Sequence, residues 1–441
     1  MATVKAKEQP AEDEKKLREE IEKKHGKSVE QLYEEREKRV RDAIELREPD
    51  RVPVTVGTGV FAARYAGLTS SAQYYDHAGY REACKKMLLE FEPDTGQAQA
   101  GNSGLVLEMI GSKDQRWPGG PLPPDAPYQF VEGEYMKADE YDLFLKDASD
   151  FIIRTYLPRV YSSLAPFSKL PPFNALIGAN GFVSSLGIFN RPELREAVGI
   201  LSKAAKEQEK VRKDGADFAA EMVRLGFPSQ ERGNSAGGAP FDLVSDRLRG
   251  MLGSMIDMYR CPDKLLATCD RILEWRIAQA APADPKGTGN LKIGGGALHR
   301  GSDGFMSLKQ FETFYWPGLK KATFASIELG YVVSHFYEGV WDQRLEYLLE
   351  LPKGKLIFHC EKTDLFKAKE VLGGHMCIQG GVPPTLLEIG SPQEVEEHCK
   401  KLIKVVGKGG GFILGPGSSI DYAKPANIKA MVDSVKKYGW Y

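Results

Sequence analysis

The last third of the chain alternates apolar strands with helical segments. Strand-like runs begin at residues 331, 355, 375 and 411 (YVVSHF, KLIFHC, HMCIQ and GFIL), and each is followed by a run with helical periodicity. This rhythm with short turns is typical of successive βα units, which place parallel strands side by side. Four units make half of a (β/α)8 barrel, and the preceding residues are numerous enough to supply the other half.

A doubly wound sheet is the alternative for such a pattern. It would carry a glycine-rich phosphate turn after its first strand. The first apolar strand here follows Asp50, at residues 52–54, and the next segment, TVGTGVFAAR, matches that turn poorly. We therefore predict an α/β chain with a single (β/α)8 TIM barrel over residues 47–441.

Between the first strand and the last third, the pattern is less regular. Periodicity predicts two long helices, over Arg191–Leu225 and Pro262–Ala281, each beginning near a proline, which the first turn of a helix accepts. Residues 113–175 are rich in proline, glycine and aromatic side chains, which indicates a long insertion. The segment 235–250 (SAGGAPFDLVSDRLRG) is predicted to be a loop above a strand end.

Residues 1–46 are densely charged and are predicted to form a helical extension before the barrel. Within this segment, apolar side chains recur at helical spacing and form a narrow stripe: Val29, Leu32, Tyr33, Val40, Ala43 and Ile44. We interpret it as a solvated helix on the outside of the barrel, with a coiled-coil or partner-binding arm as the alternative. The first 20 residues are predicted to be disordered.

Charge and hydropathy exclude several classes of protein. The 60 basic and 61 acidic side chains nearly cancel, so no positive excess predicts a nucleic-acid partner. No run of about 18 uncharged apolar residues is present to span a membrane, and the charged N-terminus lacks the apolar segment of a secretory signal. Six cysteines without regular spacing do not form a disulfide framework. These features predict a cytoplasmic enzyme without a nucleic-acid or membrane partner.

The ends of the last four strands carry the residues suited to chemistry. In a barrel the active site is built from the loops at the C-terminal ends of the strands. These ends read HFYEG (335–339), HCEK (359–362), MCIQ (376–379) and GPGSS (415–419). Three of the seven histidines and two of the six cysteines lie between residues 335 and 377. Such a group of nitrogen, sulfur and oxygen donors predicts a metal site, with zinc as the metal.

Strand geometry suggests which of these donors converge. Alternate residues of a strand share a face, so His359 and Glu361 can point the same way while Cys360 points opposite. With Glu338 and Cys377 from neighbouring strands they complete a predicted set of zinc ligands, in which Glu338 and His359 are also the predicted catalytic residues. The alternative is that Cys360 and Cys377 are ordinary buried thiols of apolar strands.

Other residues could border this site. His77 and His299 lie in loops, although a structural role is the simpler interpretation for each. Two glycine-rich segments, Gly289–Gly304 and Gly409–Ser419, are predicted to be flexible loops that keep the barrel mouth wide. Five aromatic side chains could line a pocket, with core packing as the alternative: Trp117, Tyr128, Phe130, Tyr135 and Trp341.

Several longer segments carry a family resemblance. They are EEREKRVRDAIELREPDRVPV, FDLVSDRLRGMLGSMIDMYRCPDKLL, SLKQFETFYWPGLKKATFASIELGYVVSHFYEG, LIFHCEKTDLFKAKEVLG, CIQGGVPPTLLEIGSPQEV and GGGFILGPGSSI. From Pro49 to its C-terminus the chain resembles the uroporphyrinogen decarboxylase superfamily, and within it the corrinoid-dependent methyltransferases that demethylate small methylated substrates. The resemblance implies a TIM barrel.

The resemblance also implies a zinc site. The methyltransferases of this family bind zinc through a His-x-Cys pair and a cysteine in the C-terminal loop. His359 matches the histidine, but Glu361 takes the place of the paired cysteine and Ser418 that of the late one, which leaves Cys377 and Glu338 as replacements. A site richer in oxygen makes zinc a stronger Lewis acid, which suits polarising an ether or phenol oxygen.

The function implied is a zinc-dependent methyltransferase. It would move a methyl group from a small methylated substrate, for instance an aryl methyl ether, to the Co(I) corrinoid (cobalamin) of a partner protein. The near-zero net charge predicts a transient, weakly salt-dependent complex with that protein, and a homodimer is left open.

Two other functions are kept as alternatives. One is a uroporphyrinogen decarboxylase-like lyase acting without metal, and the other is a catalytically silent binding protein. The segment FAARYAGLTSS keeps only Arg64, too few arginines to hold a polycarboxylate tetrapyrrole. Arg247 and Arg249 could compensate, but we expect them to pair or cap within SDRLRG.

Overall fold

Parallel strands form the centre of the molecule and close on themselves. The computed structural model describes residues 12–57, 59–96, 103–228, 231–285, 287 and 291–441. Its main sheet is parallel, in the order β3 (Glu231–Arg232), β4 (Lys292–Gly294), β6 (Val332–Tyr337), β7 (Leu356–Cys360), β8 (Cys377–Val382) and β9 (Phe412–Pro416), with β5 (Ala297–Leu298) also on β6.

Two isolated bridges join the start of the chain to the last strand. Val54 pairs in parallel with Leu414 of β9, and Thr55 pairs in parallel with Thr95. The first strand segment therefore lies between the last strand and the second segment, as the closure of a barrel requires and an open doubly wound sheet does not allow. The predicted (β/α)8 barrel is confirmed.

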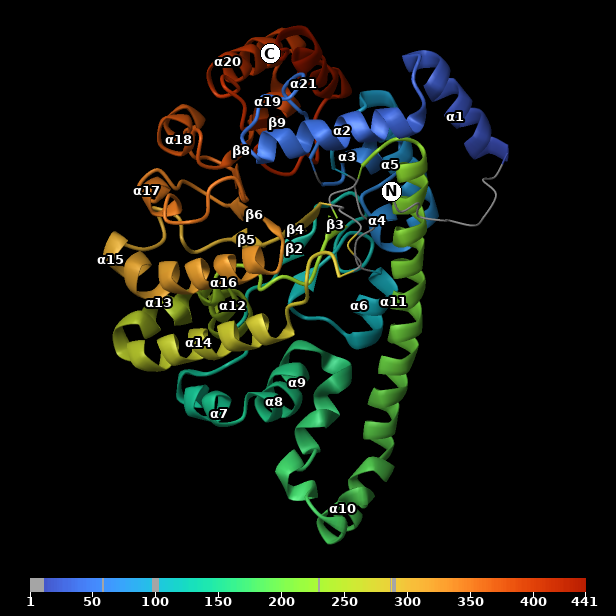
Figure 1. Ribbon diagram of the computed structural model, residues 1–441. Coiled ribbons are helices and arrows are strands. Elements are labelled where there is room, and N and C mark those ends of the chain that lie inside the picture. The colour runs from blue at the N-terminus through green and yellow to red at the C-terminus, as the bar shows by residue number, and fades with distance from the viewer. Residues whose placement is uncertain (1–11, 58, 97–102, 229–230, 286, 288–290) are drawn as a thin grey trace.

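Helices cover the outside of the barrel (Figure 1). Prolines in the first turn begin several of them, and Ser391 with Glu394 forms a capping box at α20. Both long helices predicted from periodicity are confirmed to within two residues. The helix expected after β6 is a single turn, α17. The covering helices are α5 (His77–Phe91), α11 (Pro192–Arg224), α14 (Pro262–Gln279), α16 (Trp316–Glu328), α17 (Leu345–Leu348), α18 (Leu365–Leu372), α19 (Pro384–Ile389), α20 (Pro392–Val405) and α21 (Pro425–Tyr438).

A long excursion separates the second strand segment from β3, as the composition of residues 113–175 predicts. It contains the antiparallel pair β1 (Gln115–Arg116) and β2 (Gln129–Phe130). Its helices are α6 (Gly104–Ile110), η1 (Ala138–Glu140), α7 (Tyr141–Lys146), α8 (Ala148–Phe151), η2 (Ile152–Tyr156), α9 (Leu157–Val160), η3 (Ser162–Lys169), η4 (Phe173–Leu176), α10 (Ala179–Ser185) and η5 (Leu186–Asn190). The 33-residue α11 returns the chain to the barrel, and α10 lies at its far end (Figure 1).

Short helical turns fill the connections around the barrel. After the first strand segment come α3 (Phe61–Tyr65) and α4 (Ala72–Tyr75). After β3 come α12 (Pro240–Leu243), the π-helix η6 (Val244–Arg249) and α13 (Gly250–Arg260), so the loop predicted for residues 235–250 is helical from Pro240 onward. Before α16 lie α15 (Leu308–Gln310) and the π-helix η7 (Phe311–Tyr315).

The N-terminal segment begins with two helices, α1 (Glu12–His25) and α2 (Val29–Ile44). The prediction that the first 20 residues are disordered is therefore wrong from residue 12 onward. Residues 1–11 lie outside the described part. Ser28 and Gln31 form a capping box that starts α2. The predicted boundary between residues 1–46 and the barrel stays a prediction.

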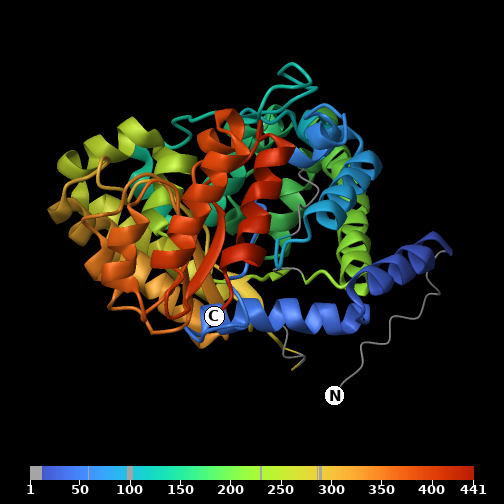
Figure 2. The same cartoon turned by 90° about the horizontal axis from the view of Figure 1, so that it is seen from above.

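All of the predicted apolar stripe of α2 except Tyr33 is buried, and its C-terminal part lies against the barrel floor. Val40, Ala43 and Ile44 form one cluster with side chains at the starts of four strands, which are Ile293, Ile357, Cys377 and Ile413. Figure 2 shows α2 lying across one end of the molecule. The helix is thus not simply a solvated helix on the outside, because its stripe closes the N-terminal end of the strands. We call this set of side chains the floor cluster.

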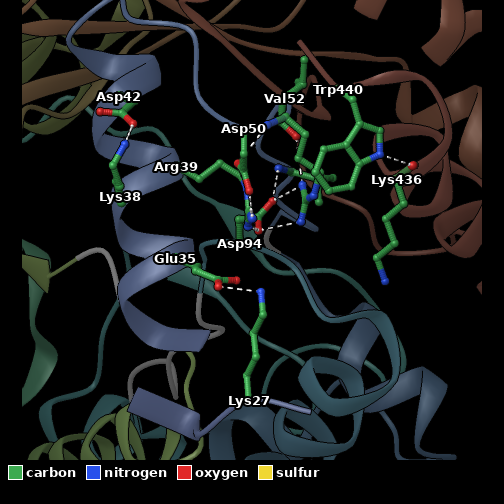
Figure 3. A network of polar contacts seen from close by, with 12 residues as sticks. Lys27, Glu35, Lys38, Arg39, Asp42, Asp50, Val52, Asp94, Lys436 and Trp440 are labelled. Atoms are coloured by element: carbon green, nitrogen blue, oxygen red, sulfur yellow. Dashed lines mark hydrogen bonds and ion pairs between the residues drawn. The ribbon is translucent and has the colours of Figure 1, made fainter. Parts of the chain in front are cut away.

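A buried ionic network fixes α2 to the first two strand segments (Figure 3). The Asp94 carboxylate is fully buried and accepts hydrogen bonds from Arg39 Nη1 at 2.5 Å, Arg51 Nη1 at 2.7 Å and the Val54 amide at 2.9 Å. Arg39 also reaches Asp50 through two nitrogens at 2.6 Å. Burial would raise the pKa of Asp94, but Arg51 and Arg39 outweigh it and lower that pKa.

One of the two segments predicted to be flexible loops contains a strand. Within Gly409–Ser419, residues 412–416 are the buried strand β9, so only residues 417–419 lie at its C-terminal end. Gly409–Gly411 precede the strand and adopt positive φ angles at the floor end. None of the described helices is long and apolar enough to cross a membrane.

Candidate active site at the barrel mouth

Inward-facing side chains of β6 and β7 define the barrel mouth. Val332 and Ile357, near the strand starts, contribute to the floor cluster. Because alternate residues of a strand share a face, Phe336 and Glu338 continue the inward row of β6, and His359 continues that of β7. The rings of Phe336 and His359 have centroids 5.0 Å apart, consistent with side chains on one face of paired strands.

Three of the predicted site residues, Glu338, His359 and Glu361, lie at the C-terminal ends of these strands. The Gly339 amide donates a hydrogen bond to Glu361 Oε2 at 2.9 Å, and the Glu338 side chain is 50% exposed. The loop after β9 approaches the same edge, because a Cβ on Gly417 would lie 3.0 Å from the Glu361 carbonyl oxygen. Ser418, where the resemblance expects a cysteine, follows directly.

Cys377 lies at the other end of the barrel. It is the first residue of β8, it is fully buried, and it belongs to the floor cluster with Ile413 and Ala43. Burial raises the pKa of its thiol, which is therefore held neutral. The sequence pattern predicts that this strand ends near Gln379, whereas β8 runs from Cys377 to Val382. The structure consequently does not bring Cys377 together with His359.

Gln379 takes the inward position of β8 beside His359, its register partner on β7. Its side chain is 8% exposed, and no described residue donates a hydrogen bond to its Oε1. Buried acceptors are normally paired, so a donor group of a ligand fits this position. Cys360 belongs to the main core instead, where burial raises the pKa of its thiol to about 12.

These donors do not assemble into the expected zinc site. A catalytic zinc takes three protein ligands and keeps one position open. In the described part of the chain, no three His, Cys, Asp or Glu side chains are grouped so that they could hold a metal ion. The arrangement of Glu338, His359 and Glu361 thus does not match a ready zinc site, and the zinc ligand set stays a prediction.

A histidine–carboxylate pair stands beside Glu338. His299 follows β5, and its Nδ1 lies 2.6 Å from Asp246 Oδ2, while its Nε2 lies 3.5 Å from Glu338 Oε2. The hydrogen bond with Asp246 raises the pKa of His299, against the opposing effect of burial. Carboxylates beside both ring nitrogens favour the protonated imidazole, and only in that form is Nε2–H a donor, here toward Glu338 at the mouth. The structural role favoured for His299 from sequence overlooked this pair.

Asp246 comes from the π-helix η6, a type of element that is frequent at functional sites. Its second oxygen accepts a hydrogen bond from Arg300 Nη2 at 3.1 Å, and Arg300 Nε donates to Ser245 Oγ at 2.9 Å. Both oxygens of Asp246 are therefore held, one by His299 and one by Arg300. The only sequence signal for this group was the polar run after Pro240.

The carboxylate of Asp242 positions the loop that carries His299. It is buried and accepts hydrogen bonds from the backbone amides of His299 at 3.2 Å and Arg300 at 2.9 Å. The Tyr315 hydroxyl donates to it at 2.6 Å. Burial raises the pKa of Asp242 to about 6, although these donors favour the ionised form. Asp242 thus fixes the backbone of the loop while Asp246 fixes the imidazole.

A cavity of about 460 Å³ lies where the excursion before β3 meets α4 and η6. Its polar lining is Asp114, Gln115 and Arg247, and its aromatic lining is Tyr74, Tyr128, Phe130, Tyr156 and Tyr161. We call it the tyrosine pocket. Tyr128 and Phe130 line it, as the sequence suggested. The other predicted aromatics do not: Tyr135 packs edge-on against Tyr156, and Trp117 and Trp341 are buried in the core.

The arginines of η6 form their ion pairs with side chains outside this helix. Arg247 Nη1 donates to Asp114 Oδ2 at 2.9 Å. Arg249 is buried and pairs with Asp257 at 2.6 Å, so the expectation that both pair within SDRLRG is wrong. Arg64 stacks on Tyr422 with its guanidinium carbon 4.4 Å from the ring centroid. Arg247 and Arg249 find partners outside SDRLRG because η6 directs its side chains to different sides of the helix.

The comparisons with known proteins show what the C-terminal part is similar to. Residues 234–438 match the family model described as uroporphyrinogen decarboxylase (URO-D). The match leaves out the N-terminal half of the chain. The URO-D match includes η6, β5 and β6–β9, and hence His299 and all of the predicted site residues, but not the hairpin of the tyrosine pocket.

Among curated proteins, the uroporphyrinogen decarboxylase of Chlorobium phaeovibrioides is 37% identical over 79 residues, 17% of this chain and 22% of the relative. That of Syntrophotalea carbinolica is 23% identical over 207 residues, 46% of this chain and 58% of the relative. The aligned stretches span less than two thirds of either relative. A methyltransferase from Methanosarcina mazei shares the fold, with a TM-score of 0.58 and 17% identity, covering 91% of this chain and 98% of that one.

Proposed function

We propose that this protein is a methyltransferase that transfers the methyl group of a small methylated substrate to the Co(I) corrinoid of a partner protein. The observation that carries the proposal is His299, held at Nδ1 by Asp246 and directed through Nε2 toward the open mouth. The structural similarity to a protein named a methyltransferase supports the choice of reaction as well as of fold.

The reaction needs a proton at the substrate oxygen that loses its methyl group. A Co(I) corrinoid bound to the partner protein would supply the electron pair for the new bond to the methyl carbon. The pair of the broken methyl–oxygen bond stays on the substrate oxygen, which becomes an alkoxide or phenoxide. His299 Nε2–H is placed to donate its proton to that oxygen as general acid, a role typically worth 10² to 10⁴ in rate.

The neighbours of His299 prepare it for this role. Asp246 stabilises the protonated ring, and Asp242 holds the backbone of the loop in place. Glu338, 3.5 Å from Nε2, occupies the side from which the substrate oxygen would approach. Gln379 Oε1, buried and without a donor among the described residues, offers an acceptor deeper in the barrel for a substrate hydroxyl or amide.

Zinc enters this proposal only as the prediction from sequence. Glu338, His359 and Glu361 do not form a three-ligand group, so we assign no step to a metal. The predicted catalytic role of His359 and Glu338 likewise stays a prediction. Metal analysis of the purified protein measures the zinc content directly.

A URO-D-like lyase is the second candidate, favoured by the family model and the curated relatives. A general acid at His299 could also protonate a carbanion left by decarboxylation. The mouth carries three carboxylates, however: Asp246 pairs with Arg300, Glu361 with Lys362, and Glu338 lies beside His299. Repulsion by these carboxylates disfavours a substrate with many carboxylates.

The test is methyl transfer from a series of aryl methyl ethers to cob(I)alamin, followed by the absorbance of methylcobalamin. His299→Gln should slow ethers of weakly acidic phenols at least 100-fold, because their phenoxide needs the proton. The loss should shrink for ethers of acidic nitrophenols, whose phenoxide leaves unaided. A merely structural role would slow all ethers equally.

A matched control is His375→Gln, whose residue lies near the floor end and bonds the Leu351 carbonyl oxygen at 2.8 Å. It should leave the whole series unchanged. If no methylated donor yields methylcobalamin, even with the corrinoid protein, the proposal fails. Release of CO₂ from a carboxylated substrate would then support the lyase.

A further inference from the structure

The tyrosine pocket contains one ion pair whose two charges differ in accessibility. The Asp114 side chain is 9% exposed, and it accepts hydrogen bonds from Ser112 Oγ at 2.6 Å and from Arg247 at 2.9 Å. The Arg247 side chain is 46% exposed. A ligand that enters the pocket therefore meets the guanidinium, while the negative charge is shielded behind it.

Arg247 is held in place with donors to spare. Its guanidinium carbon lies 4.7 Å from the Phe130 ring centroid, and one nitrogen is committed to Asp114. A guanidinium has five N–H donors in a planar fork that matches a carboxylate. Among the described residues these are its only contacts of this kind, so donors remain for an anionic ligand.

The other walls of the pocket suit an aromatic ring. Five aromatic side chains line a cavity of about 460 Å³, a size usual for small-molecule sites. Burial raises the pKa of Tyr128 and Tyr156, so their hydroxyls stay protonated and can donate. Such walls contact a flat ring on its faces and edges.

We infer that the tyrosine pocket binds an aromatic carboxylate, with the carboxylate on Arg247 and the ring among the tyrosines. This inference rests on the proposed function in one respect: the ligand would be the methylated substrate, an aryl methyl ether that carries a carboxylate. The pocket then gives the substrate class that the mouth alone leaves open.

The position of Arg247 in the chain supports this orientation. Asp246 and Arg247 are consecutive on η6, and they serve the mouth and the pocket respectively. Tyr128, in the pocket wall, is close enough to Asp246 for its charge to raise the pKa of that phenol in addition to the larger effect of burial. A carboxylate anchored at Arg247 is thereby separated from Asp246, which is directed to His299.

Binding alone tests the inference, without cobalamin. Calorimetry on the full chain would compare 4-methoxybenzoate with two matched probes, the neutral 4-methoxytoluene and the cationic 4-methoxybenzyltrimethylammonium. We expect 4-methoxybenzoate to bind at least tenfold more tightly than either. Equal affinities, no binding of any probe, or preference for the cation would overturn the inference.

Three variants sharpen the result. Arg247→Gln should weaken the affinity for 4-methoxybenzoate at least tenfold and leave the affinity for the neutral probe within twofold. The affinity of Arg247→Lys for 4-methoxybenzoate should lie between those of the wild type and Arg247→Gln. Arg116→Gln, an exposed arginine of the same hairpin outside the pocket, is the matched control and should change nothing. If Arg247→Gln and Arg116→Gln bind the carboxylate alike, Arg247 is not its anchor.

Asp114→Asn separates a carboxylate site from a cation site. Removing the shielded negative charge should maintain or strengthen carboxylate binding, whereas a site for cations would lose affinity. Melting temperatures of all variants check that the fold is intact. Carboxylate binding without methyl transfer would refute the proposed function and leave the pocket assignment standing; methyl transfer from ethers without carboxylate preference would do the reverse.

Discussion

Asp94→Asn tests whether the buried network below the barrel stabilises the fold. The Asp94 carboxylate joins Arg39 of α2 to Arg51 and Val54 of the first strand segment, and it precedes Thr95 of the second. Both guanidinium groups are themselves buried, at 7% exposed. The substitution keeps the size of the side chain and removes its charge.

The expected cost follows from these contacts. Removing one partner of a buried ion pair typically costs about 3–5 kcal/mol, because the remaining charge stays buried. Arg39 retains Asp50, whose side chain is 47% exposed, whereas Arg51 keeps only a bond to the amide oxygen and loses the charge that balances its own. We therefore expect the free energy of unfolding to fall by about 3 kcal/mol.

Denaturant unfolding, followed by tryptophan fluorescence and circular dichroism together, measures this change and checks that both probes report one transition. The matched control is Glu35→Gln, which removes the same charge from an exposed pair with Lys27 at 2.6 Å (Figure 3). An exposed pair contributes less than about 1 kcal/mol. If Asp94→Asn costs no more than Glu35→Gln, the network does not stabilise the fold in the way argued.

Two further predictions concern Asp242 and Cys377. The folded protein keeps a proton on Asp242 up to about pH 6, whereas the unfolded chain releases it near 3.8. The stability from this group is present below pH 3.8 and is lost as pH rises, so the free energy of unfolding should fall by about 3 kcal/mol between about pH 4 and 6. Asp242→Asn should remove this slope in urea titrations at several pH values. Cys377→Ala should leave the zinc content of the purified protein, measured by elemental analysis, equal to that of the wild type, because the thiol lies in the floor cluster; a loss of zinc would contradict this.

The barrel could be predicted because its signal is local and repeated. Each of the last four strands is a short apolar run followed by a helical pattern, and the structure has β6, β7, β8 and β9 there. The packing of α2 was harder to predict. Its stripe was visible, but a stripe on a charged helix does not say which surface covers it. That surface consists of side chains from β4, β7, β8 and β9, far away in the sequence.

The placement of single site residues depended on strand ends, which sequence locates poorly. An end position two or three residues too early was enough to put Cys377 at the mouth instead of the floor. For His359 and Glu361, by contrast, the prediction that they share a face needs only their spacing and not the position of the strand end. Asp246 and Arg247 could not be paired with His299 and Asp114, since a π-helix has no simple sequence pattern and both partners lie in separate segments.

The two sites around η6 favour differently charged groups of a substrate. The mouth presents Asp246 and Glu338 to an incoming group, and a proton donor at His299 between them, so it favours a neutral ether oxygen that becomes negative only as it leaves. The tyrosine pocket presents Arg247 and favours a group that is already negative. A molecule that carries both groups at opposite ends of one ring satisfies both sites, whereas a polycarboxylate satisfies only the second. The division of charge along η6 is therefore the reason to expect methyl transfer from an aromatic acid in preference to decarboxylation of a tetrapyrrole.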